Sequence, residues 1–346
     1  MTAKWLYWFD ELGTGDIQLV GKKCANLGEM TKARVAVPPG FALSLHAYQR
    51  FMRETGLGEE ITEFAQQYGE EGPKGFGQLT EVSQHCMKLI ESKEMPADMA
   101  EAIKENYRKL CDYCGIPDVA VAVRSSGPVS MPGAFSTHLN IIGEDDVATN
   151  VIKVWASTFT VQSLGQRLAE HHPLLIDGIG IAILKMVKAK TAGVGFTMHP
   201  TTMDPAKIVI EGSWGLGEVV VGSNVSPDRI IIDKNTGEVE KHINPKLEQV
   251  VYMEKGTQVV PVPPELQNAP CLNDDEIKRI SELAISIEKY YGVAQDIEWV
   301  IDADLPPSRN LFLVQCRNIS VVKPKKKESE LIADMMLRRV FQRRTS

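Results

Sequence analysis

The sequence lacks long apolar runs. Hydrophobic residues make up 43% of its 346 positions, yet no stretch approaches the roughly 18 consecutive apolar residues of a transmembrane helix. Residues 1–10 contain neither a long apolar region nor a cleavage-like site of the kind that ends a secretory signal. We therefore expect a cytoplasmic protein with no membrane partner.

The sequence also lacks an excess of positive charge. It has 38 Lys and Arg against 45 Asp and Glu, which gives a net charge of −7. This balance argues against a nucleic-acid partner held by bulk electrostatics. A phosphate site needs only a few cations, so any anion site must be local.

Cysteine motifs are almost absent. The six cysteines are scattered, as is typical of reduced cytoplasmic thiols, and only Cys111 and Cys114 lie close together. Without a second pair at zinc-site spacing, this pair indicates either a metal or redox use or the end of a helix closed by Gly115.

The patterns that are present predict a mixed α/β protein large enough for more than one lobe. Apolar periodicity predicts helices between residues 44 and 110 and one long helix over residues 146–172. A capping box formed by Asn273 and Glu276 predicts a helix that ends at Gly292. Strands are predicted near residues 119–124, from 137, and near 179–187, 192–198, 208–211, 229–233 and 239–242.

A hairpin near the C-terminus is predicted by two strands, residues 295–301 and 310–317, which flank a turn at Pro306. Symmetric folding places Asp296 opposite Arg317 and Glu298 opposite Gln315 on one face. Such a face fits either a surface ribbon with charge pairs worth ~0.2–1 kcal/mol each or a platform for Mg²⁺ and a triphosphate.

Three further stretches carry candidate functional residues. Lys23 follows Gly21 and is either a phosphate contact or a solvated lysine. A buried strand ends in Arg124 and Ser125, before a Gly/Pro/Ser loop that either cradles phosphate or simply closes a hairpin. Glu211 ends an apolar strand ahead of a glycine cluster whose spacing does not match the dinucleotide fingerprint.

Four motifs in order carry a resemblance to a known family. They are residues 21–30 (GKKCANLGEM), 123–126 (VRSS), 212–218 (GSWGLGE), and 296–299 (DIEW) with 315–317 (QCR). Together they resemble the ATP-binding domain of phosphoenolpyruvate synthase and pyruvate phosphate dikinase. The resemblance covers roughly residues 10–320.

This resemblance implies an α/β (α+β), two-lobed, ATP-grasp-like nucleotide-binding fold. The first lobe would span residues 1–190 with a helical insert, the second residues 191–322, and residues 323–346 would form a charged linker and tail helix. The implied cofactors are ATP and Mg²⁺.

The resemblance also implies roles for individual residues. The implied catalytic residues are Lys23, Arg124 and Arg317. The implied metal ligands are Asp296, Glu298 and Gln315. The implied ATP contacts are Lys23, Arg124, Ser125, Gly133, Thr137, Lys185 and Glu211.

The sequence departs from the family pattern in its first loop, where Lys22 and Cys24 replace glycines and Arg34 and Ala36 replace a usual Gly and Pro. Leu184 stands where many members have Gln. The family's swivelling domain, with its Thr-Ser-His-Ala phosphohistidine motif, and its acceptor-binding barrel do not occur in the sequence.

These features imply either a subunit of a split dikinase or a fragment. The split arrangement occurs in phenylphosphate synthase, and the first expectation is that enzyme's ATP-binding subunit. It would pass a pyrophosphoryl or phosphoryl group to a histidine on a partner subunit, which binds the small-molecule acceptor, phenol. The alternatives are a split or truncated phosphoenolpyruvate synthase, an antibiotic phosphotransferase relative, and a catalytically silent nucleotide-sensing scaffold.

Overall fold

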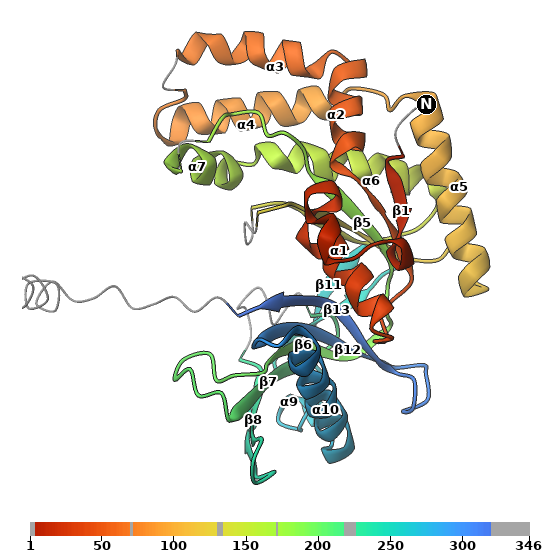
Figure 1. The fold of residues 1–346 in the computed structure, drawn as a ribbon, viewed down its shortest axis with the longest axis vertical. Helices are drawn as coiled ribbons and strands as arrows, with labels where there is room; N and C mark the ends of the chain where they lie inside the picture. The colour runs from red at the N-terminus through yellow and green to blue at the C-terminus, as the bar shows by residue number, and fades with distance from the viewer. Residues whose placement is uncertain (1–3, 70–71, 130–133, 171, 218–225, 320–346) are drawn as a thin grey trace, which may run out of the picture.

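Two antiparallel sheets organise the protein in its computed structural model, which describes residues 4–69, 72–129, 134–170, 172–217 and 226–319 (Figure 1). The first sheet has the order β1-β2-β5-β3-β4 and the second β13-β12-β6-β7-β8-β9. The expected mixed α/β, two-lobed class is confirmed. The predicted boundaries at residues 190 and 322 stay predictions, and the predicted tail helix lies outside the described residues.

The first sheet is built from β1 (Leu6–Trp8), β2 (Gly40–Leu43), β3 (Val121–Ser126), β4 (Thr137–Ile141) and β5 (Gly180–Lys185). Its surrounding helices are α1 (Ile17–Lys32), α2 (Leu45–Glu54), α3 (Leu57–Ala65), α4 (Gly75–Glu91), α5 (Ala97–Cys114), α6 (Glu144–Ala156) and α7 (Val161–Ala169). Short 3-10 turns occupy Phe9–Glu11, Thr14–Asp16, Gln66–Tyr68 and Ser157–Phe159.

Side-chain alternation along β3 places helices on both faces of this sheet. Val121 and Val123 point to one face and join the fully buried core made with α2 to α7. Ala122 points to the other face, where it joins a second core with α1. Helix α1 also packs against strand β13, so it lies between the two sheets.

The second sheet is built from β6 (Ala189–Phe196), β7 (Lys207–Trp214), β8 (Asp228–Asp233), β9 (Val239–His242), β12 (Gln295–Asp302) and β13 (Leu311–Asn318). A separate hairpin comprises β10 (Glu248–Tyr252) and β11 (Thr257–Pro261), and the helices are α9 (Pro264–Gln267) and α10 (Asp274–Tyr291).

Trp299 anchors the inner face of this sheet against α10. Its side chain is fully buried, and its indole Nε1 donates to the carbonyl oxygen of Val194 at 3.0 Å. Gly212 makes room for the ring, since a Cβ there would lie 2.8 Å from the indole. With Ile297 and Trp299 fixed inward, the alternate residues Asp296 and Glu298 must face the opposite side.

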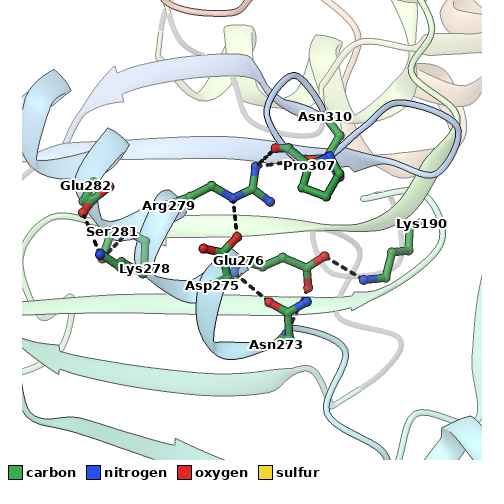
Figure 2. Close-up of polar contacts among 10 residues, drawn as sticks. All are labelled: Lys190, Asn273, Asp275, Glu276, Lys278, Arg279, Ser281, Glu282, Pro307 and Asn310. Atoms are coloured by element: carbon green, nitrogen blue, oxygen red, sulfur yellow. Dashed lines mark hydrogen bonds and ion pairs between the residues drawn. The ribbon is translucent and has the colours of Figure 1, made fainter.

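Helix α10 begins and ends as predicted. Asn273 Oδ1 accepts from the Glu276 backbone N–H at 2.9 Å, and the Glu276 carboxylate accepts from the Asn273 N–H at 2.9 Å (Figure 2). Gly292 closes the helix with φ of +70°. Arg279 then donates to Asn310 Oδ1 at 2.9 Å and to the Pro307 carbonyl, which ties α10 to the turn of the β12–β13 hairpin.

Two predictions about secondary structure are wrong or incomplete. The single helix over residues 146–172 is instead α6, a 3-10 turn and α7, because the Thr160 hydroxyl accepts from the Ser163 N–H at 3.2 Å and starts a new helix. The β10–β11 hairpin was not predicted at all.

The close cysteine pair lies at the end of α5, which Gly115 closes in a left-handed conformation with φ of +63°. All six cysteines are free thiols. Within the described ranges, no helix is both long and apolar enough to cross a bilayer. A cytoplasmic location stays a prediction.

Candidate active site

The β12–β13 hairpin has the predicted register. Asp296 pairs with Arg317 and Glu298 pairs with Gln315. Arg317 Nε and Nη2 each lie 2.7 Å from Asp296 Oδ2, and Gln315 Nε2 donates to Glu298 Oε1 at 2.7 Å. Acid, amide and guanidinium groups therefore gather on one face, and a β-bulge follows immediately after Glu298.

Arg124 joins this face from the other sheet. Its Nη2 donates to Glu298 Oε2 at 3.2 Å, and the two side chains are only 19% and 18% exposed. In the described part of the chain, Arg124 Nε and Gln315 Oε1 are buried and have no hydrogen-bond partner. Both side chains contact Glu298. Because buried polar groups are normally satisfied, an unpaired donor and an unpaired acceptor around one carboxylate indicate a place for a ligand.

A kink in α1 brings Lys23 to the same place. Gly21 adopts φ of +77°, and a Cβ on it would lie 1.9 Å from the Ser126 carbonyl oxygen. The Lys22 N–H then donates to the Gly127 carbonyl at 2.9 Å, and the Cys24 N–H donates to Ser126 Oγ at 3.0 Å. The loop accommodates both departures from the family pattern. The Lys22 side chain is exposed to solvent, and the small Cys24 side chain is fully buried in the core.

The charge at this place is predominantly positive. The pKa of Lys23 is lowered to about 8, first by burial and then by the positive charges of Arg124 and Arg317, which outweigh the opposing carboxylate of Glu298. Lys23 makes no hydrogen bond or ion pair with any described residue. An anion would relieve this repulsion, so the cluster fits a phosphate group.

The oxygen donors fit a magnesium ion. Mg²⁺ is usually held by one or two carboxylates together with substrate phosphates, and Asp296, Glu298 and Gln315 offer two carboxylates and one unpaired amide oxygen. Burial raises the pKa of Asp296 despite the opposing Arg317, so a nearby cation would stabilise its charged form. No group of three His, Cys, Asp or Glu side chains suited to a metal occurs among the described residues.

Of the other predicted ATP contacts, some lie next to Arg124 and others do not. Thr137 pairs directly with Arg124 across β3 and β4, and Ser125 is buried next to it. Lys185 pairs instead with Val121, three residues from Arg124 along β3, so the register does not bring it to the cluster. Gly133 lies outside the described residues.

Glu211 shares the sheet face of the hairpin but has a different partner. Glu298, Val194 and Glu211 pair in a row across β12, β6 and β7. Glu211 Oε1 then forms an ion pair with Arg229 Nε of β8 at 3.6 Å. Sequence reasoning missed Arg229, although a charged residue at the start of a predicted strand, directly before three isoleucines, was a usable signal.

The unpredicted β10–β11 hairpin connects the second half of the chain to the first. Asn140 of β4 donates through Nδ2 to the carbonyl oxygens of Met253 and Gly256, each at 2.7 Å. Lys255 forms an ion pair with Asp146 at 3.0 Å. These contacts bridge β4 and α6 to the β10–β11 turn, so we name residues 248–261 the bridging hairpin.

Comparisons with known proteins find several similar sequences. A probable phosphoenolpyruvate synthase of Methanocaldococcus jannaschii is 39% identical over 95% of this chain and 28% of the relative. A probable phosphoenolpyruvate synthase of Staphylothermus marinus is 37% identical over 96% of this chain and 43% of the relative. The phosphoenolpyruvate synthase of Aeropyrum pernix is 35% identical over 95% of this chain and 44% of the relative. The chain thus spans less than half the length of these curated relatives.

A solved structure of D-alanyl-alanine synthetase A from Vibrio cholerae O1 matches 70% of this chain and 56% of its own chain, at 11% identity and a TM-score of 0.29. That score is too low to support an argument about the fold. The match to the family described as pyruvate phosphate dikinase, AMP/ATP-binding domain, extends over residues 17–337. The chain therefore belongs to this family of ATP-binding domains from dikinase-type, ATP-dependent phosphotransferases.

Proposed function

We propose that this chain binds Mg²⁺–ATP between Arg124 and the β12–β13 hairpin and donates a pyrophosphoryl or phosphoryl group to a histidine on a partner subunit. One observation carries the proposal: Lys23, Arg124 and Arg317 gather beside Glu298 and Gln315, where a buried donor and a buried acceptor lack partners. The family match supports ATP as the nucleotide.

Each residue of the cluster has a proposed task. Lys23 and Arg124 hold the phosphates, which relieves the repulsion between the two cations. Asp296, Glu298 and Gln315 would hold Mg²⁺, which when bound supplies positive charge to the phosphate oxygens. In this structure the Nε and Nη2 atoms of Arg317 both contact Asp296. We propose that it exchanges this partner for the phosphoryl group in transfer.

The proposed overall reaction converts ATP, water and phenol to phenylphosphate, AMP and phosphate. Phenol is the proposed acceptor because phenylphosphate synthase has a separate subunit that resembles the ATP-binding domain indicated by the four motifs. A second candidate acceptor is pyruvate, which would give phosphoenolpyruvate, and the names of the relatives that are 35–39% identical favour it. In both cases the acceptor pocket would lie outside this domain, and we place the protein in the cytoplasm.

Nucleotide binding is tested by a thermal shift. Because a ligand that prefers the native state stabilises it, Mg²⁺–ATP at 100 times its Kd should add about 2.7 kcal/mol to the free energy of unfolding. An unchanged melting curve at millimolar nucleotide contradicts the proposal and favours the silent scaffold. Matched measurements on Lys23→Met, with its cation removed, show whether the gain comes through this cluster.

The acceptor is tested by AMP release. AMP and phosphate should form only when a histidine-bearing partner is added, and parallel reactions with phenol and with pyruvate identify the final product. Robust phosphorylation of this chain's own His138, His171, His172 or His199, located by mass spectrometry under alkaline conditions, contradicts the partner histidine.

A further inference from the structure

A second group of polar side chains lies on the same sheet face as the proposed ATP site. The row Gln315, Glu298, Val194, Glu211 and Arg229 pairs directly across five strands, from β13 to β8. Directly paired residues of antiparallel strands share one face. Since adjacent strands lie about 4.8 Å apart, Arg229 is roughly 14 Å from Glu298 along the sheet.

His199 faces Arg229 from the segment that follows β6. Its Nδ1 accepts hydrogen bonds from the backbone N–H groups of Thr201 and Thr202, at 3.3 and 3.1 Å. A ring nitrogen that accepts carries no hydrogen, so Nε2 must carry it. His199 Nε2–H is therefore a donor.

The nearest partner of this donor is another donor. Arg229 Nη2 lies 3.4 Å from His199 Nε2. Arg229 Nε is buried and forms no hydrogen bond with any described residue, because the Glu211 carboxylate at 3.6 Å is beyond hydrogen-bond distance. The Nε–Nη2 edge is the one through which arginine binds oxyanions bidentately. Here Nε has an ion-pair partner, the Glu211 carboxylate at 3.6 Å, but no hydrogen bond with any described residue.

We propose that Arg229, His199 and Glu211 form a second oxyanion subsite, for a hydrogen phosphate group, separate from the nucleotide site. Glu211 then contacts this phosphate in place of the ATP contact that the resemblance implies for it. Oxygens of the phosphate accept from the Arg229 edge and from His199 Nε2–H. The remaining P–OH donates to the Glu211 carboxylate. A simple carboxylate ligand has no proton to give, so Glu211 would repel it.

This chemistry admits two sources, free orthophosphate and a phosphate of the nucleotide. The separation of roughly 14 Å from the metal platform favours free orthophosphate. Orthophosphate is also a product of the proposed reaction, and that last point alone rests on the proposed function.

The test measures binding of inorganic phosphate by phosphorus NMR and calorimetry, with and without a saturating non-hydrolysable ATP analogue and Mg²⁺. Phosphate should bind in the presence of the analogue. Arg229→Gln should weaken phosphate binding about tenfold or more, since it removes the bidentate edge, and should change analogue affinity by less than about threefold. Complete displacement of phosphate by the analogue overturns the separate subsite and assigns these donors to the nucleotide.

Control variants show whether a loss of phosphate binding comes from the Arg229 contact itself, from a change in net charge or from misfolding. Lys207→Gln removes a cation from the same two strands, but Lys207 is already paired with Asp233 at 2.9 Å, so phosphate affinity should not change. Arg229→Lys keeps the charge and loses the planar edge, and it should also lose most phosphate affinity. Equal affinity in wild type, Arg229→Lys and Arg229→Gln overturns the subsite. Analogue binding through Lys23 and Arg124 is read separately, so failure of the ATP site is distinguishable.

Discussion

Two lysines in buried surroundings illustrate two different uses of charge. Lys246 is fully buried, and its Nζ lies 2.6 Å from Asp228 Oδ1 and 2.8 Å from the Asn244 carbonyl. The other Asp228 oxygen accepts from the Cys271 N–H at 2.8 Å. Lys23 instead has no hydrogen bond or ion pair among the described residues and lies near two arginines.

The difference concerns what completes each group of charges. Around Lys246 the protein itself supplies a carboxylate and a carbonyl oxygen as partners, and the network fixes β8 to the segments that follow it. Around Lys23 the protein leaves positive charge, a donor and an acceptor unmatched. Perturbed and uncompensated groups cluster at functional sites, and we therefore expect the first region to control stability and the second to control ligand binding.

The largest expected effect is on phosphoryl transfer. Glu298→Gln keeps the size of the side chain but removes the anion that is proposed to hold Mg²⁺, and Arg317→Lys removes the planar two-pronged contact. Loss of a charge-stabilising arginine in phosphoryl transfer costs about 10³-fold or more in rate. AMP release with the partner present should fall accordingly, and ATP affinity should fall less than turnover.

A folded Glu298→Gln protein that turns over ATP at a near-normal rate would contradict a functional role for the region around Lys23 and Glu298. A surface ribbon pair would give that result, with a stability loss under about 1 kcal/mol. Melting temperatures measured alongside show whether any loss of turnover comes from unfolding.

The next largest effect is on stability at the other region. Lys246→Met leaves Asp228 buried without its cation, which should cost about 3–5 kcal/mol of unfolding free energy. Adding Asp228→Asn removes the uncompensated charge and should restore part of this loss. Urea denaturation measures both, and a Lys246→Met protein as stable as the wild type would contradict the structural role.

Local sequence signals predicted much of this molecule. The pairs Asp296–Arg317 and Glu298–Gln315 followed from alternation and a symmetric turn, although the one-residue shift after Glu298 did not. The limits of α10 followed from Asn273, Glu276 and Gly292. These features depend on neighbours in sequence or on one short hairpin, so the residues themselves carry the information.

Features that depend on distant contacts could not be predicted in this way. The Arg124–Glu298 ion pair joins residues 174 positions apart, and Arg229 meets His199 only through the order of β6, β7 and β8. The bridging hairpin was missed because its apolar residues do not alternate with polar ones: Val250 and Val251 are adjacent, as are Val259 and Val260. The break within residues 146–172 depends on a single side-chain cap at Thr160.

A pH dependence sharpens the contrast between the two lysines. The folded-state pKa of Lys23 is lowered from 10.5 to about 8, so its charge opposes folding below pH 8. Stability should therefore rise as pH increases from about 8 to 10.5, where the unfolded chain binds the extra proton. Lys23→Met should raise the melting temperature of the free protein at pH 7 and abolish this rise.

The same lysine should link ATP binding to proton uptake. Bound phosphate favours the charged ammonium, so ATP should bind with uptake of a proton near pH 8–9 and lose up to about tenfold in affinity for each pH unit above 8. Calorimetry in buffers of different ionisation enthalpy measures the uptake. Identical proton uptake by Lys23→Met would show that another group is responsible.

The smallest expected effect is on the bridging hairpin, which contains neither Lys23 nor Lys246. Asn140 makes two side-chain hydrogen bonds to the 253–256 turn and adopts φ of +55°. Asn140→Gly tolerates that φ and removes only the side chain, so it should cost roughly 1–2 kcal/mol. Asn140→Ala adds the strain of a left-handed conformation and should cost more.

Because hinge motions around nucleotides separate two lobes, loss of this bridge should quicken ATP dissociation and hydrogen exchange in residues 248–261. Unchanged dissociation in a folded Asn140→Gly protein would show that the bridging hairpin does not restrain opening.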